Sequence, residues 1–129
     1  MGHENLATHS VYQIGEQADE YAVNQANVVF IAVPPGGRRI VVERVLMSLD
    51  PAAATDEFNL TLLDSAGARI GSNKLTTQEY PILRLVGGHP CAFFEDLNWN
   101  VPVGLGLNIT TTVTGGASTH GIFVQYHTV

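Results

Sequence analysis

The last thirty residues contain two stretches, 106–114 and 119–129, in which apolar and polar side chains alternate. In the first stretch apolar residues such as Leu107 alternate with polar residues such as Asn108. Alternation with a period of two places one face of a strand on a core and leaves the other face free. A Gly-Gly pair separates the two stretches, so they predict a β-hairpin and an all-β protein.

More stretches of strand-forming residues follow one another at short spacing, with Gly, Pro and Asp turns between them. Together with the hairpin they give eight or nine strands, which predicts an antiparallel β-sandwich. That number fits a jelly roll better than a seven-stranded immunoglobulin sandwich. The further strands are expected at Val28–Val33, Arg39–Leu49, Phe58–Leu62, Ala68–Ser72, Glu79–Val86 and Cys91–Trp99.

Residues 1–20 are polar and have no helical period, so they predict an extended N-terminal arm ahead of a single β-sandwich domain, residues 21–129. A loosely attached first strand around Val11–Ile14 is the alternative. The N-terminus lacks the basic start and apolar core of a signal peptide. No apolar run approaches the roughly 20 residues of a membrane span. We therefore expect synthesis in a cytoplasm, no secretion by a signal peptide and no membrane partner.

Charged residues make up 14% of the chain, against about 25% in ordinary soluble domains. Lys74 is the single lysine. A chain without the usual charged surface is expected to cover much of that surface with other protein, which favours a homo-oligomer. The net charge of -6 argues against a nucleic-acid partner, which needs clustered basic residues. Cys91 is the single cysteine, so no intrachain disulfide forms, and we expect it to be a small buried residue.

The histidines do not match a metal-site pattern. His3 and His9 lack helical zinc spacing. His120 and His127 are an odd number of positions apart, so on one strand they face opposite sides, which argues against a cupin-type metal site. We expect His89, His120 and His127 to face solvent.

The acidic residues and serines show no catalytic arrangement either. Asp56-Glu57 and Glu95-Asp96 are adjacent pairs, whose members point to opposite faces of a strand and form no acid/base dyad. We expect these acids to be solvated. A calcium site using Asp50 with Asp56-Glu57 is left open. No Gly-x-Ser-x-Gly motif is present in the sequence, and we expect a protein that is not an enzyme and has no cofactor or metal.

Aromatic residues concentrate at Phe93, Phe94 and Trp99. Adjacent residues of a strand cannot both face one core, so one phenylalanine is expected to point outward unless the strand is covered on both sides. An exposed aromatic side chain is typical of a contact surface, although Trp99 between two asparagines could instead form a platform for a sugar. With the outward positions of the hairpin and one residue of the arm, the candidate interface residues are Tyr12, Phe93, Phe94, Trp99, Asn108, Thr110 and Thr112.

Two segments carry a resemblance to a known class of protein. One is the turn Pro102–Leu107 that leads into a Thr-rich strand, a Gly loop and a strand ending in Tyr126-His-Thr-Val. The other is the Pro-Gly-Arg entry into a long strand, Val33–Val42. The pattern resembles small β-sandwich virion structural proteins of tailed bacteriophages. That resemblance implies a capsid decoration (cement) protein, commonly a trimer on the head surface, with the major capsid protein or another virion protein as its partner. It implies no catalytic residues.

Three function classes therefore compete. The leading hypothesis is a non-enzymatic virion protein that clamps neighbouring shell subunits through its arm and uncharged sheet faces. The alternative is a carbohydrate- or receptor-binding β-sandwich module, for example of a phage tail or fibre, with Trp99 and one phenylalanine at the site. A small cupin-type enzyme is the third. Assembly explains the low charge, which a monomeric lectin or enzyme would not need.

Overall fold

The computed structural model describes residues 13–50, 52–71, 83–115 and 119–129. These residues form nine β-strands and no helix, so the all-β prediction is confirmed. No part that the structure describes forms a helix able to cross a membrane. The strands are β1 (Gln13–Tyr21), β2 (Val28–Ile31), β3 (Ile40–Asp50), β4 (Glu57–Asp64), β5 (Leu83–Val86), β6 (Cys91–Phe94), β7 (Trp99–Asn100), β8 (Leu107–Thr114) and β9 (Thr119–Thr128).

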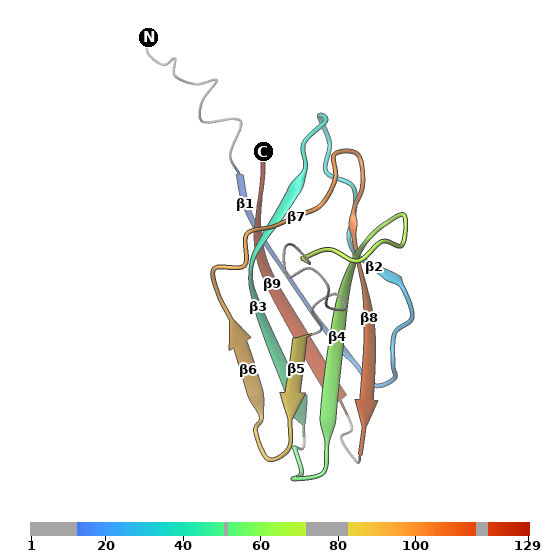
Figure 1. Ribbon diagram of the computed structural model, residues 1–129, viewed down its shortest axis with the longest axis vertical. Helices are drawn as coiled ribbons and strands as arrows, with labels where there is room; N and C mark the ends of the chain where they lie inside the picture. The colour runs from blue at the N-terminus through green and yellow to red at the C-terminus, as the bar shows by residue number, and fades with distance from the viewer. Residues whose placement is uncertain (1–12, 51, 72–82, 116–118) are drawn as a thin grey trace, which may run out of the picture.

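The strands form two antiparallel sheets, which face each other as two layers (Figure 1). Sheet one has the order β1-β9-β3-β6, and the two-residue strand β7 also pairs with β3. Sheet two has the order β2-β8-β4-β5. The predicted antiparallel sandwich is therefore present.

The winding of the chain is that of a jelly roll. When β7 is set aside, the first and last strands pair, and the second pairs with the second-last. Likewise β3 pairs with β6, and β4 pairs with β5 at the centre of the chain. Four nested antiparallel pairs wound into two sheets define the jelly-roll topology, so the predicted jelly roll is confirmed.

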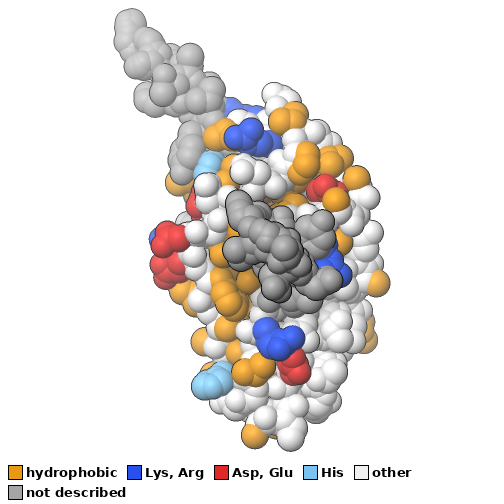
Figure 2. All heavy atoms as spheres, viewed as in Figure 1, with side chains coloured by type: hydrophobic (Ala, Val, Ile, Leu, Met, Phe, Trp, Pro, Cys, Tyr) orange, Lys and Arg blue, Asp and Glu red, His pale blue; other side chains and the backbone are white. Residues whose placement is uncertain are grey.

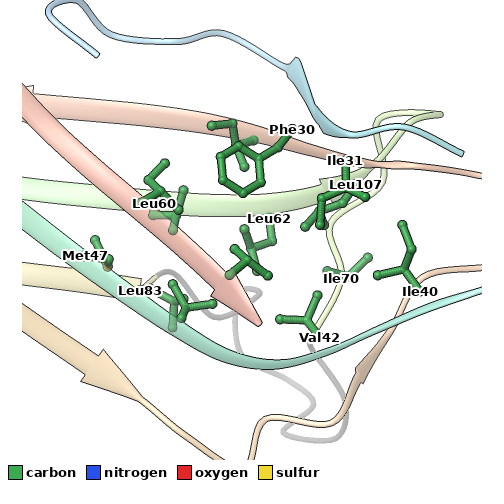
Figure 3. Close-up of a cluster of buried hydrophobic side chains, with 14 of the residues drawn as sticks. Phe30, Ile31, Ile40, Val42, Met47, Leu60, Leu62, Ile70, Leu83 and Leu107 are labelled. Atoms are coloured by element: carbon green, nitrogen blue, oxygen red, sulfur yellow. The ribbon is translucent and has the colours of Figure 1, made fainter. Parts of the chain in front are cut away.

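Side chains on the inner faces of both sheets fill the space between the layers (Figure 3). On β4, Phe58, Leu60 and Leu62 are buried at alternate positions, as the period of two predicts. Each fully buried side chain of this size contributes about 1.5–3 kcal/mol. The core also includes Phe30, Ile31, Ile40, Val42, Val45, Met47, Leu49, Ile70, Leu83, Leu85, Val101, Leu107, Ile109, Ile122 and Val124.

Part of the expected N-terminal arm belongs to the sheet. Residues 13–20 lie in β1, which pairs with β9 from Gln13 opposite Thr128 to Tyr21 opposite His120 without a register shift. The alternative of a first strand around Val11–Ile14 overlaps β1 at Gln13 and Ile14. The rest of β1 gave no periodic signal because this edge strand is polar or exposed on both faces. The remaining arm residues, including Tyr12, lie outside the described residues.

Two other expected strands differ from the observed ones. The stretch Cys91–Trp99 breaks into β6 and β7 because Asp96 and Asn98 adopt positive φ angles of 56° and 51°. Asp and Asn tolerate that left-handed conformation better than most residues. In the expected strand Ala68–Ser72, Arg69 makes one isolated bridge with Leu63. Ser72 and residues 79–82 of the expected strand Glu79–Val86 lie outside the described residues.

Candidate interaction surfaces

The outer face of sheet two is largely uncharged. Thr110 and Thr112 point outward from β8, and they pair across the sheet with Thr61 and Asn59 of β4. Thr110 is half-buried and Thr112 is exposed, in agreement with their predicted outward positions. Hydroxyl and amide groups on one face can form hydrogen bonds with a partner without the burial of an unpaired charge.

Asn108 occupies the same outward register but is buried, with 6% of its surface exposed. Its Nδ2 donates a hydrogen bond to Oδ1 of Asn27, 3.1 Å away, and Val29 of the neighbouring strand β2 pairs with it. The expectation that Asn108 is an exposed contact residue is therefore wrong. The reason is that β2 and the residue before it cover this end of β8.

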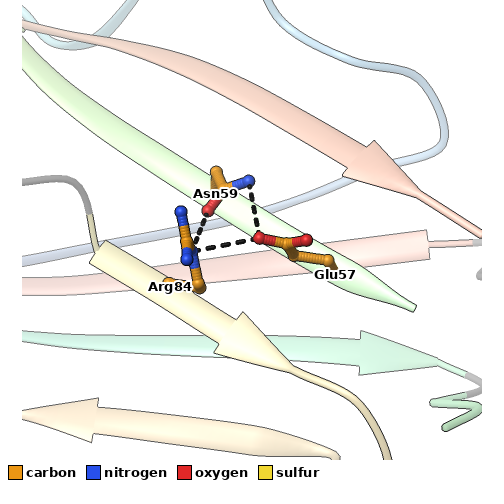
Figure 4. A network of polar contacts seen from close by, with 3 residues as sticks. All are labelled: Glu57, Asn59 and Arg84. Atoms are coloured by element: carbon orange, nitrogen blue, oxygen red, sulfur yellow. Dashed lines mark hydrogen bonds and ion pairs between the residues drawn. The ribbon is translucent and has the colours of Figure 1, made fainter. Parts of the chain in front are cut away.

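Two charged residues on this face, Glu57 and Arg84, neutralise each other (Figure 4). Nε of Arg84 lies 3.0 Å from Oε2 of Glu57 and donates a hydrogen bond of 2.9 Å to Oδ1 of Asn59. Nδ2 of Asn59 in turn donates to Oε2 of Glu57 at 3.3 Å. An exposed ion pair of this kind contributes only about 0–1 kcal/mol to stability. Its consequence here is that these two residues add no net charge to the outer face of sheet two.

The outer face of sheet one carries a row of apolar side chains across four strands. The register places Ala18 of β1 beside Phe123 of β9, Phe123 beside Leu46 of β3, and Leu46 beside Phe93 of β6. We call these four residues the apolar stripe. Phe93 is 49% exposed, whereas its neighbour Phe94 packs against the core. The prediction that one of the two phenylalanines points outward is confirmed.

Beside the apolar stripe lies a shallow hollow of about 430 Å³. The next row across the sheet is Glu20, Gly121, Ser48 and Cys91. These small central residues leave space over β9 and β3, and Gly121 contributes no side chain at all. The hollow adjoins the apolar stripe directly, since Leu46 and Phe123 also line it.

Cys91 is exposed at this edge of sheet one. Its expected burial is wrong because it lies on the outward side of β6, opposite Ser48. The surrounding sequence, Pro90-Cys91-Ala92, suggested an apolar environment but did not give the side of the strand. The thiol is therefore a natural chemical probe of this surface.

Trp99 is less exposed than a ring that stacks against a sugar. It is partly buried against the core, and its ring lies over the backbone of Gly71. A Cβ built on Gly71 would be 2.4 Å from Cδ2 of the indole ring. One face of the ring is therefore already occupied by protein, and no feature of the described residues favours the sugar-binding alternative.

His120 is a core residue, which corrects the expectation that it faces solvent. It is 3% exposed, and its Nε2 lies 2.9 Å from Oγ1 of Thr111. Its ring packs edge-on against Phe58 and tilted against Tyr21. Burial lowers the pKa of His120 from its usual value of 6.5. The sequence could have predicted this burial, because His120 lies two and four positions before Ile122 and Val124, which are buried on the same face of the strand.

The burial of His120 predicts a pH-dependent stability. The folded state disfavours the imidazolium, so the unfolded chain binds more protons once the pH falls below about 6.5. The neighbouring Tyr21 has a pKa raised by burial and by Asp19, so it stays neutral in this range. We expect the free energy of unfolding, from urea titrations, to fall between about pH 7 and pH 5. His120→Gln should reduce that fall, and His89→Gln, at an exposed histidine, should not. An equal fall in all three proteins would contradict this account.

His127 points to the opposite face of sheet one from His120, as the odd spacing predicts, but only 12% of its side chain is exposed, so the expectation that it faces solvent is wrong. Its Nδ1 lies 2.7 Å from Oε2 of Glu43. His89 is exposed, as expected. Across the part of the chain that the structure describes, no three His, Cys, Asp or Glu side chains group closely enough to hold a metal ion.

Asp56 is buried rather than solvated. Its Oδ2 accepts a hydrogen bond of 2.8 Å from the backbone N–H of Ala53, and 2% of its surface is exposed. A short side-chain acceptor that binds a backbone donor three residues away stabilises a turn. The role that this contact indicates for Asp56 is structural. Glu57 is half-buried, whereas Glu95 and Asp96 are exposed as expected.

Comparison with known proteins finds similarity of fold only. No protein-family model matches the chain, and no curated protein matches it. A structure of the Helicobacter pylori bacteriophage KHP30 capsid aligns at 10% identity over 91% of this chain and 88% of that chain, with a TM-score of 0.45. A pilus of Bacillus endospore appendages aligns at 13% identity over 90% of this chain and 88% of its own, with a TM-score of 0.42. The cyanophage Pam1 capsid aligns at 15% identity over 90% and 84%, with a TM-score of 0.41.

Proposed function

We propose that this chain is a non-enzymatic structural subunit of a virion. In this proposal it acts as a capsid decoration (cement) protein that stabilises a phage head through contacts between subunits. The observation that carries the proposal is the uncharged outer face of sheet two, where exposed and half-buried threonines surround one self-neutralised ion pair.

The chemistry of that face suits contact with protein. A free protein surface usually carries interspersed lysines and acids for solubility. Protein interfaces are depleted in charge at their centres. Thr110, Thr112 and Thr61 offer hydroxyl groups that can donate or accept hydrogen bonds, so a partner could cover them at little electrostatic cost.

The size of the face favours assembly through several contacts. Strands β2 and β5 have four residues each and β8 and β4 have eight. At a rise of about 3.3 Å per residue and a spacing of about 4.8 Å between strands, they give a face of roughly 400 Å². A stable interface buries about 800 Å² on each partner. One sheet face alone would therefore hold a pair only weakly, whereas a trimer on a shell uses several such contacts at once.

Sedimentation velocity of the full chain over a range of concentrations tests this function. We expect species larger than a monomer that grow with concentration. Thr112→Arg places a charge at the centre of the face and should shift the protein to a monomer. Thr55→Arg is a matched control at an exposed position between β3 and β4, and it should leave assembly unchanged. A parent protein that sediments as a monomer at every concentration would count against the proposal.

A further inference from the structure

We propose that the apolar stripe of sheet one binds the loop between β2 and β3 of a second copy of this chain. The contact would be head-to-tail, with different surfaces on the two copies. This inference rests on the proposed role in assembly. It adds which surface of one copy is covered and which segment of the next copy covers it. We call residues 32–39, Ala-Val-Pro-Pro-Gly-Gly-Arg-Arg, the β2–β3 loop.

The receiving surface combines apolar area with negative charge. Glu16 and Glu20 lie on β1 on either side of Ala18, both outward and exposed. The apolar stripe and the hollow beside it thus have carboxylates along one border. Arg44 is the one basic residue in the outward register of β3. A partner that fits this surface needs small apolar groups next to positive charge.

The β2–β3 loop has that combination. Val33 is 49% exposed and Pro35 is also exposed. Arg39 is exposed, and among the described residues no ion pair involves its side chain. Arg38 donates one hydrogen bond of 3.3 Å to the backbone oxygen of Thr128. The loop therefore presents apolar contact area and two arginine side chains that form no ion pair with the described residues.

The loop also projects from the domain. Gly36 and Gly37 have positive φ angles, and a Cβ built on either would meet nothing within 4 Å. Figure 1 places the loop at the upper end of the molecule, and Figure 2 shows basic side chains at that end. The two prolines of the loop restrict its backbone before it binds, which lowers the entropy cost of ordering that part.

The loop and the apolar stripe of one copy are separated along the sheet. Leu46 lies six residues along β3 from Ile40, where the loop ends, which is about 20 Å at the rise of an extended strand. The occupant of the stripe would therefore come from a neighbouring copy. Two copies of sheet one placed face to face would instead bring their carboxylates together. Charge complementarity favours the heterologous arrangement, which forms rings or extended arrays.

A charge exchange between the two surfaces tests the proposal. One variant carries Arg38→Glu and Arg39→Glu, and the other carries Glu16→Arg and Glu20→Arg. Each variant alone places like charges at the contact, so we expect at least about tenfold weaker self-association in sedimentation velocity. In an equal mixture every contact between the two different variants carries opposite charges, so self-association should be restored in arrays or rings in which the variants alternate. This rescue also shows that both variants are folded.

A second pair of variants, one on the apolar stripe and one control, tests the apolar part of the contact. Phe93→Ser on the apolar stripe should weaken assembly, whereas Val23→Ser, at 68% exposure in the connection between β1 and β2, should not. Alkylation of Cys91, beside the stripe, should be slower in assembled parent protein than in the charge variants. Charge variants that assemble like the parent, or a mixture that stays monomeric, would overturn the loop contact while leaving the proposed function standing. A monomeric parent would contradict both proposals.

Discussion

Replacement of Phe58 by alanine is expected to lower the free energy of unfolding by about 3–5 kcal/mol. Phe58 is fully buried near the start of β4, where it pairs with Leu85 and Val113 of the two neighbouring strands. Its ring also supports His120 from the opposite sheet, with centroids 4.9 Å apart. The truncation would leave a cavity between the sheets and remove one wall of the His120 site. Because small domains are stable by only about 5–15 kcal/mol, this change should remove a large part of the total.

Equilibrium unfolding in urea measures the effect, and Phe93→Ala provides the control. Phe93 has the same side chain in a strand of the other sheet, but half of its surface is already exposed. We expect a loss below about 1 kcal/mol for this variant. Equal losses for Phe58→Ala and Phe93→Ala would show that the two layers do not pack as described.

Deletion of residues 1–20 should destabilise the fold, while deletion of residues 1–12 should not. The longer deletion removes all of β1 except Tyr21, and with it eight of the nine residue pairs between β1 and β9. Backbone hydrogen bonds are lost and the edge of β9 is exposed, so we expect a loss of about 3 kcal/mol or more. The shorter deletion ends before β1 and leaves this pairing intact.

The two deletions also separate folding from assembly. If residues 1–12 clamp a neighbouring subunit, their removal should abolish assembly in sedimentation velocity without a change in the urea midpoint. Normal assembly of the shorter deletion would argue against the arm-clamp mechanism. A longer deletion that unfolds at the same urea concentration as the parent would show that β1 contributes little to the fold.

The sequence predicted the architecture well because alternation is a local signal. The inward positions Leu107, Ile109 and Thr111 are buried as the period requires. The jelly-roll prediction rested on the number and spacing of strands, and the observed pairing confirms it.

Burial at individual positions was harder to predict because it depends on neighbouring strands. Asn108 has the outward register of Thr110 but is covered by β2, which is distant in the sequence. His120 was assigned to the surface from its residue type, although its register is inward. Cys91 was assigned to the core for the same kind of reason and is exposed.

The apolar stripe could not be predicted because its four residues come from four strands. Ala18, Leu46, Phe93 and Phe123 are separate apolar positions in the sequence, and the register of sheet one brings them into one row. Their relation to the β2–β3 loop depends on charges that are likewise distant along the chain. To predict a surface patch of this kind, one needs the register between strands as well as the alternation within each strand.

Electron cryo-microscopy of the assembled protein, or of particles that contain it, tests the central claim most directly. The account predicts repeated jelly rolls in which the outer faces of the sheets contact neighbouring subunits, with Thr112 and the apolar stripe covered by protein. Particles from which the chain is absent would contradict it. So would assemblies in which the outer faces of both sheets remain open to solvent.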